Sequence, residues 1–293
     1  MLENGKNAGL KEERMNHAKP AREFARALRI PLRATLLSIP VLLFVSFLGL
    51  PLVAIFLRVL PQEGIWETLQ EPLVTEALRL SALTSLSSLL FAVSFGTPIA
   101  YLLARHRFRG AVLLDTLIDL PMVLPPTVAG VALLMAFGRR GILGMWLDAI
   151  GVQIGFTTFA VILAQSFVSA PFYIRAARAG FQSVDQELER VAYTLGRSAF
   201  STFLRVTVPL ALPALLGGAV MAWARALGEF GATIMFAGNL IGRTQTMPLA
   251  IYIAMESDLT AALVLSAILV LVSFSVLFLV RLLLRRSPFG AYA

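Results

Sequence analysis

Two ionisable side chains, Arg225 and Glu229, stand within a long apolar segment of this sequence, residues 206–236. They lie four positions apart, about one helical turn, so a helix carries both on one face. Ionisable residues at membrane depth are costly and usually functional. Two interpretations remain open. The residues form a structural ion pair, or Arg225 attracts an anion while Glu229 holds the Arg225 side chain in position. Gly228 and Gly231 flank Glu229 and permit close backbone approach or a local break in the helix.

A second cluster consists of three prolines within six residues, Pro121, Pro125 and Pro126, followed by Thr127. Proline removes a backbone donor and opposes a continuous helix, so carbonyl groups lose their partners within the apolar segment 111–137. Such groups are tolerated at membrane depth only where protein or a water-filled cavity satisfies them. We therefore predict a broken helix whose four named residues border a transport pathway, with a simple packing kink as the alternative.

A third candidate is the polar segment 187–213, which lies between two apolar runs. A short helix is expected to begin near Leu188 and to stop at Gly196. Glu187 and Glu189 then lie near the positive end of the helix dipole, where carboxylates are favourable. The segment is the one place where the chain offers an extended charged surface to a soluble partner.

The same segment has an apolar side made by Val191, Leu195 and Phe200, and a second helix is expected to begin near Ser198 or Ser201. An apolar helix face of this kind fits the groove of a partner protein. The alternative is an amphipathic helix that lies on the lipid surface. The pattern alone leaves both interpretations open.

The composition places these three clusters in a membrane protein. Of the 293 residues, 58% are hydrophobic and 14% are charged, and the mean hydropathy is +0.80. Soluble proteins average about 25% charged residues. Six apolar segments approach or exceed the roughly 20 residues that cross a bilayer. They lie near residues 36–58, 78–104, 111–137, 155–178, 206–236 and 260–282.

The basic residues fall mostly on one side of these six spans. By the positive-inside rule, both termini and the segment 187–213 face the cytoplasm. The sequence then divides into a cytoplasmic tail (1–35), a transmembrane domain (36–286) that contains the polar loop 182–205, and a cytoplasmic end (287–293). The net charge of +8 follows this topology and does not indicate a nucleic-acid surface.

The polar loop resembles the EAA loop of permease subunits of ATP-binding-cassette importers. The similarity rests on Gly196 and on the run Val-Thr-Val-Pro at 206–209, with nine residues between them. Counted back from the glycine, the motif's Glu-Ala-Ala falls on residues 190–192, of which only Ala192 matches, and Glu189 stands one residue earlier. In that family the loop forms a coupling helix that sits in a cleft of the cytoplasmic ATPase.

Other stretches resemble the permeases of molybdate importers and, more loosely, those of sulfate importers. They are the proline run 119–130 with FGRRG at 137–141, and ARALGEFGATI at 224–234 with the loop 242–249. The resemblance implies an all-α type I permease fold of six transmembrane helices in the inner membrane. It places the ATPase-coupling residues at Glu187, Glu189, Arg190, Val191, Ala192, Leu195, Gly196, Phe200 and Pro209.

The resemblance also implies the partners. They are a second permease copy, two cytoplasmic ATPase subunits and an extracytoplasmic binding protein that delivers molybdate or tungstate. ATP and magnesium then bind to the ATPases, and no cofactor or metal binds to this chain. Sulfate or another oxyanion remains open as the substrate, and so does an ion-coupled secondary carrier that uses Arg225 and Glu229 as a relay.

Enzyme chemistry finds no support in the residues. The glycine run 238–244 has one residue too few and an arginine in place of lysine, so it is not a nucleotide-binding P-loop. Cysteine is absent. A stripe of small hydroxyl residues, Ser81, Thr84, Ser85 and Ser88, recurs at helical spacing and predicts close helix packing.

Overall fold

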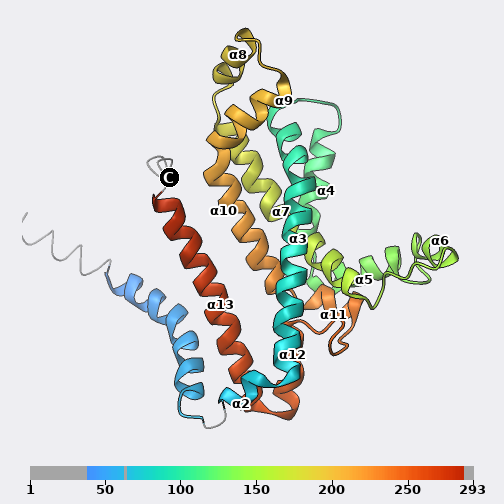
Figure 1. Cartoon of the computed structure of the whole chain (residues 1–293), viewed down its shortest axis with the longest axis vertical. Coiled ribbons are helices and arrows are strands. Elements are labelled where there is room, and N and C mark those ends of the chain that lie inside the picture. The colour runs from blue at the N-terminus through green and yellow to red at the C-terminus, as the bar shows by residue number, and fades with distance from the viewer. Residues whose placement is uncertain (1–37, 63–64, 287–293) are drawn as a thin grey trace, which may run out of the picture. The chain divides into compact units, whose positions relative to one another are not determined.

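The computed structural model describes residues 38–62 and 65–286 and divides the chain into two units, Met1–Leu60 and Pro61–Ala293. The predicted cytoplasmic ends, residues 1–35 and 287–293, lie outside the described residues. In the first unit the described residues form a helix, Ser38–Val59, drawn in blue in Figure 1. Most of its side chains are apolar and exposed, and its 22 residues suffice to cross a membrane.

In the second unit, every regular element of the described residues is a helix. In chain order its helices are α2 (Ile65–Gln70), α3 (Pro72–Arg105), α4 (Ala111–Val123), α5 (Pro126–Phe137), α6 (Gly144–Ala149), α7 (Thr158–Ser183), α8 (Gln186–Thr194), α9 (Ala199–Thr202), the π-helix η1 (Phe203–Thr207), α10 (Val208–Leu227), α11 (Gly231–Ala237), α12 (Met247–Ser257) and α13 (Leu259–Arg286).

Within the described residues, five of the six predicted spans each contain one long apolar helix, and the sixth span is broken. The five helices are Ser38–Val59, Pro72–Arg105, Thr158–Ser183, Ala199–Leu227 and Leu259–Val280. The segment 111–137 forms two helices, α4 and α5, bent by 118°, which confirms the predicted broken helix. One span differs from the sequence prediction. The segment 206–236 ends as a long helix at Leu227, and its last part is the separate helix α11.

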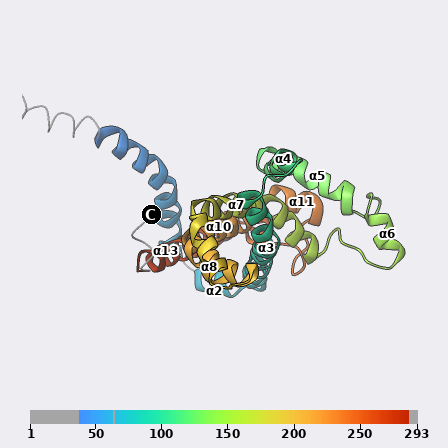
Figure 2. The same cartoon turned by 90° about the horizontal axis from the view of Figure 1, so that it is seen from above.

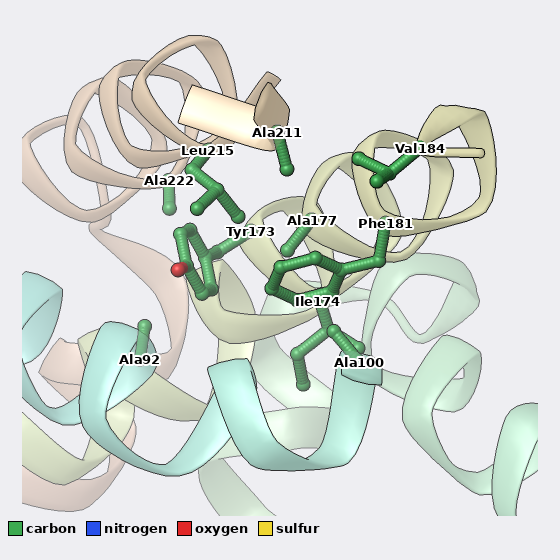
Figure 3. Packing of buried hydrophobic residues seen from close by; sticks show 10 residues of the cluster. All are labelled: Ala92, Ala100, Tyr173, Ile174, Ala177, Phe181, Val184, Ala211, Leu215 and Ala222. Carbon is green, nitrogen blue, oxygen red and sulfur yellow. The ribbon is translucent and has the colours of Figure 1, made fainter. Parts of the chain in front are cut away.

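Helix α7 forms the centre of the second unit and packs against α3 and α10. Figure 3 shows the shared core, in which the bulky Tyr173 and Phe181 of α7 fill the space beside alanines of its neighbours. A Cβ atom added at Gly96 of α3 would lie 2.9 Å from the Ile174 side chain. One added at Gly218 of α10 would lie 2.6 Å from Ala176. Small residues at these crossings let the helices approach closely, which is how helices associate within lipid.

The stripe of hydroxyl residues on α3 also lies where this helix contacts its neighbours. All four residues are buried. The Ser88 hydroxyl donates to the carbonyl of Ile162 on α7 at 3.0 Å, and Ser81 accepts from the backbone N–H of Met247 at 2.7 Å. The predicted packing role of the stripe is confirmed.

Two parts of the second unit lie away from this centre. Figures 1 and 2 show α5 and α6 extending to one side of the α3, α7 and α10 bundle. Helices α8 and α9 cap the end of the bundle at which α7 finishes and α10 begins (Figure 1). The end that carries α8 is called the α8 end below.

Candidate functional site

Helix α8 has a defined start and stop. The Asp185 side chain caps it by accepting a hydrogen bond from the Glu187 N–H at 2.9 Å. At the other end Gly196 has φ +78°, a left-handed conformation that glycine adopts without strain. The Arg197 N–H then reaches the Ala192 carbonyl at 3.1 Å, which completes a Schellman cap. The predicted stop at Gly196 is confirmed.

A second helix begins directly after this turn, as predicted. Ser198 caps α9, since its hydroxyl accepts from the Ser201 N–H at 3.3 Å. The helix then widens into the π-helix η1 before α10 starts at Val208. Pro209 is the second residue of α10 and is half-buried; it has no N–H to donate to the preceding turn, and the π-helix lies directly before it. Single-turn π-helices occur frequently at functional sites.

The predicted coupling residues divide between two faces of α8 and α9. Val191, Leu195 and Phe200 are exposed, and Leu195 keeps 77% of its surface. Glu189 and Ala192 are buried against the rest of the chain. The three exposed apolar side chains therefore form an outward surface at this end of the bundle, called the coupling face below.

The remaining charges of α8 have different surroundings. Glu187 and Arg190 form an exposed ion pair at 2.7 Å, one helical turn apart. Glu189 instead accepts from the Arg105 guanidinium at 2.7 Å and from the Thr207 hydroxyl at 2.8 Å. Both members of the Arg105–Glu189 pair are almost fully buried. Glu189 thus binds within the chain, and its side chain is not placed to reach a partner.

Arg105 is a residue that sequence reasoning did not single out, because it appears there as one of several basic loop residues. It ends α3 and also donates to the carbonyl of Val184 at 3.1 Å, beside the start of α8. A buried charge needs a partner of opposite sign and good hydrogen bonds. Arg105 therefore joins α3 to α8, and Glu189 joins both to η1.

The proline cluster produces a sharp break. Helix α4 ends at Val123, and α5 begins at Pro126 after a 118° bend, so the alternative of a simple kink is excluded. Pro121 is buried inside α4, whereas Pro125, Pro126 and Thr127 are exposed. The Pro125 carbonyl accepts from the Ala129 N–H at 3.1 Å, so the new helix satisfies part of the freed backbone. That this break borders a pathway stays a prediction.

The Arg225 and Glu229 side chains meet at a second break, between α10 and α11. One carboxylate oxygen of Glu229 lies 2.8 Å from the Arg225 guanidinium. The other accepts from the Ala232 N–H at 2.8 Å, at the first turn of α11. Glu229 is 1% exposed and Arg225 29%. The ion pair exists, and it leaves part of the guanidinium free.

The two breaks lie against each other. A Cβ atom added at Gly231 would lie 2.7 Å from the Pro126 side chain. One added at Gly130 of α5 would lie 2.6 Å from the Met235 side chain of α11 and 2.8 Å from the Ala232 carbonyl. The structure therefore brings together the two groups of pathway candidates, which are about 100 residues apart in the sequence. The coupling face is separate from them, because the 20 residues of α10 span about 30 Å.

Two further ion pairs connect α4 with α7. Asp115 pairs with Arg178 at 2.5 Å, and Asp119 pairs with Arg175. The aspartates are four residues apart on α4 and the arginines three apart on α7, so each set lies on one helix face. No short-range pattern in the sequence links residues this distant, which is why these pairs were not predicted.

The FGRRG motif forms the turn between α5 and α6. Gly138 and Gly144 approach so closely that an added Cβ at Gly144 would collide with the Gly138 carbonyl. Arg139 donates to Asp148 at 3.1 Å, and Gln153 donates to the same carboxylate. The hydrogen bond from Arg139, then that from Gln153, lowers the pKa of Asp148 below its usual value. Across the described residues no group of three or more metal-ligating side chains occurs.

Comparison with known proteins assigns this chain to a family. Residues 96–287 match the family model described as "Binding-protein-dependent transport system inner membrane component". The chain belongs to this family. The match begins within α3 and includes both breaks, the ion pairs and the whole α8 and α9 region.

Several relatives of this chain are named as permease proteins of transport systems. The molybdenum transport system permease protein ModB of Mycobacterium tuberculosis is 44% identical over 80% of this chain and 89% of its own length. The molybdate/tungstate transport system permease protein WtpB of Pyrococcus abyssi is 41% identical over 66% of this chain and 73% of its own. A bacterial ABC transporter involved in alginate import has the same fold, with a TM-score of 0.71, 17% identity, and coverage of 91% of this chain and 99% of that one.

Proposed function

We propose that this chain is the transmembrane subunit of an ATP-driven importer for molybdate or tungstate. The observation that carries the proposal is the Arg225 guanidinium, which is partly exposed where two broken helices meet. Broken helices at membrane depth are typical of transport pathways. The names of the relatives in molybdenum and in molybdate/tungstate transport support the choice of substrate.

Arg225 is suited to attract a tetrahedral oxyanion. Its planar guanidinium carries five N–H donors, and Glu229 engages it at a single oxygen within hydrogen-bond distance. The second oxygen of Glu229 is held by the Ala232 N–H, so the carboxylate fixes the arginine and leaves other donors available. Guanidinium groups bind oxyanions with paired hydrogen bonds. Positive potential near the break therefore draws the anion into the membrane.

Energy for transport comes, on this proposal, from two ATPase subunits that bind ATP and magnesium. Each ATPase receives Val191, Leu195 and Phe200 of one coupling face in a groove. The Lys and Arg distribution favours an orientation with this face and both termini in the cytoplasm. A second copy of this chain supplies the other wall of the pathway, and an extracytoplasmic binding protein delivers the anion.

Transport then follows an alternating-access cycle. Closure of the ATPases brings the two α8 helices together, and α3 and α10 move with them because Arg105 and Thr207 hold Glu189. The loaded binding protein must bind one of the two states more tightly, since a ligand shifts an equilibrium only by its differential affinity.

A second candidate, an ion-coupled carrier, is favoured by the same Arg225 and Glu229 pair, because paired charges within a membrane also relay protons. Molybdate uptake by cells that carry the transporter separates the two functions. Uptake that stops on ATP depletion and continues with an uncoupler supports the importer. Uptake that stops with the uncoupler while ATP is maintained supports the carrier and contradicts the importer.

A further inference from the structure

The Arg175–Asp119 pair connects two helices of candidate membrane spans and is not enclosed by the described chain. Arg175 stands eight residues before the end of α7, which is about 12 Å along the helix. Helix α7 has 26 residues and is therefore about 39 Å long. If the helix is centred on a hydrocarbon layer of about 30 Å, Arg175 lies about 7 Å inside that layer. At this depth 46% of the Arg175 side chain and 30% of the Asp119 side chain remain exposed.

Charges at this depth do not face lipid tails. Ionisable side chains within membrane proteins face a water-filled cavity or another protein surface. The neighbouring pair, Asp115 and Arg178, is nearer the membrane surface, and its arginine is only 25% exposed. Arg175 is therefore the cation of this helix contact that is most open to a bound or passing anion.

Asp119 and the helix break share α4. The exposed Pro125 follows Asp119 by six residues, about 9 Å of helix. The break also requires protein or water at membrane depth, because its backbone is partly freed from helical hydrogen bonds. The exposed sides of both features on this short helix therefore need water or another protein surface beside them.

Beyond Asp119, the rest of α4 and the whole of α5 carry no charge. No ionisable residue occurs between Asp119 and Arg139. A cavity of about 340 Å³ between α3, α4, α5 and α7 is lined mainly by apolar side chains, among them Pro121, Phe137 and Ile174. On α4 and α7, Arg175 is the first arginine in the direction from the break toward the α8 end.

We propose that Arg175 contacts the transported oxyanion at a second point, nearer the α8 end than Arg225, and that Asp119 competes with the anion for the guanidinium. The proposal rests on the function proposed above. A free arginine in this place holds a divalent oxyanion tightly, because charge-assisted bidentate hydrogen bonds are strong. The carboxylate of Asp119 weakens that hold and permits release toward the α8 end. Arg175 is thus a contact for the substrate, and Asp119 sets its affinity.

The test uses vesicles that contain the complete transporter, two copies of this chain with its ATPase and binding protein. ATP and increasing concentrations of molybdate are enclosed inside, at the α8 end, and uptake of external labelled molybdate is measured. In D119N the unmasked Arg175 retains internal molybdate, so uptake is inhibited at internal concentrations about tenfold lower than in the wild type. R175Q lowers uptake without this sensitivity, and the double variant behaves as R175Q does.

D115N is the matched control, because it removes the neighbouring α4–α7 ion pair. It is expected to retain the wild-type sensitivity to internal molybdate. Equal sensitivity of wild type, D119N and D115N, in complexes that assemble normally, overturns the inference. A dimer that dissociates in D119N and R175Q also overturns it, since the pair is then a contact between copies. Wild-type vesicles that take up no molybdate contradict instead the function on which the inference rests.

Discussion

Arg105 and Glu189 are 84 residues apart in the sequence, and their side chains form a buried ion pair at 2.7 Å. Thr207 donates to the same Glu189 oxygen at 2.8 Å. Helix α8 is thereby fixed to the end of α3 and to the π-helix that leads into α10. We expect a displacement of α8 to move these two long helices together.

This pair predicts the effect of its removal. Glu189→Gln leaves Arg105 charged and buried without its carboxylate, which costs about 3–5 kcal/mol. We expect a clearly lower midpoint of thermal unfolding for the purified permease, and less uptake per ATP hydrolysed. The double variant R105M with E189L removes both charges and regains most of the stability, because buried pairs are often replaceable by apolar residues. An unchanged unfolding midpoint in E189Q contradicts the described role of the pair.

Substitutions on the coupling face are expected to weaken binding of the partner ATPase and to leave the stability of the permease unchanged. Leu195→Asp and Phe200→Asp place a charge on side chains that are 77% and 72% exposed, so the permease itself is little affected. Buried in an ATPase groove, the same charge is expected to weaken association at least about tenfold. Co-purification of a co-expressed ATPase measures this. Ile142→Asp, at an exposed residue of the α5–α6 turn, is the control and is expected to retain the ATPase.

A side chain at position 196 is expected to destabilise the protein only through the backbone conformation. No atom lies within 4 Å of a Cβ added there, so only the left-handed φ of +78° opposes a side chain. Gly196→Ala is expected to cost about 1 kcal/mol, and Gly196→Asn less, because asparagine tolerates this conformation. Limited proteolysis of the loop compares the alanine and asparagine variants with the wild type. Protection of both variants at the wild-type level contradicts the cap.

The contact between the two breaks predicts a steric effect. Gly231→Ala and Gly130→Ala force atoms to within 2.7 Å and 2.6 Å of Pro126 and Met235, and such overpacking costs about 1–3 kcal/mol. Gly217→Ala is the matched control, since nothing lies within 4 Å of its added Cβ in helix α10. The control is expected to be neutral or stabilising, by up to about 1 kcal/mol. Thermal unfolding of the three variants checks this order.

The helices and their interruptions were predictable because they depend on local chemistry. Gly196 ends α8, Ser198 begins α9, and the prolines after Asp119 break the span, each through a short-range backbone preference. The 118° angle was not predictable, since it depends on how Gly130 and Gly231 pack between α5 and α11.

The long-range ion pairs were also beyond the sequence. The Arg and Asp residues of α4 and α7 were visible only as loop-side charges, and nothing in their spacing indicated which carboxylate each arginine meets. Glu189 illustrates the same limit. Its motif position suggested contact with a partner, whereas the structure directs its carboxylate to Arg105.

The most direct test of the proposed function is uptake of labelled molybdate into vesicles that contain the reconstituted transporter. ATP is enclosed inside and the binding protein is added outside. We predict uptake that requires both ATP and the binding protein and that falls at least about tenfold in R225Q, because the guanidinium that attracts the anion is lost. Uptake of sulfate with molybdate excluded, or molybdate uptake that is independent of ATP, would contradict the proposed function.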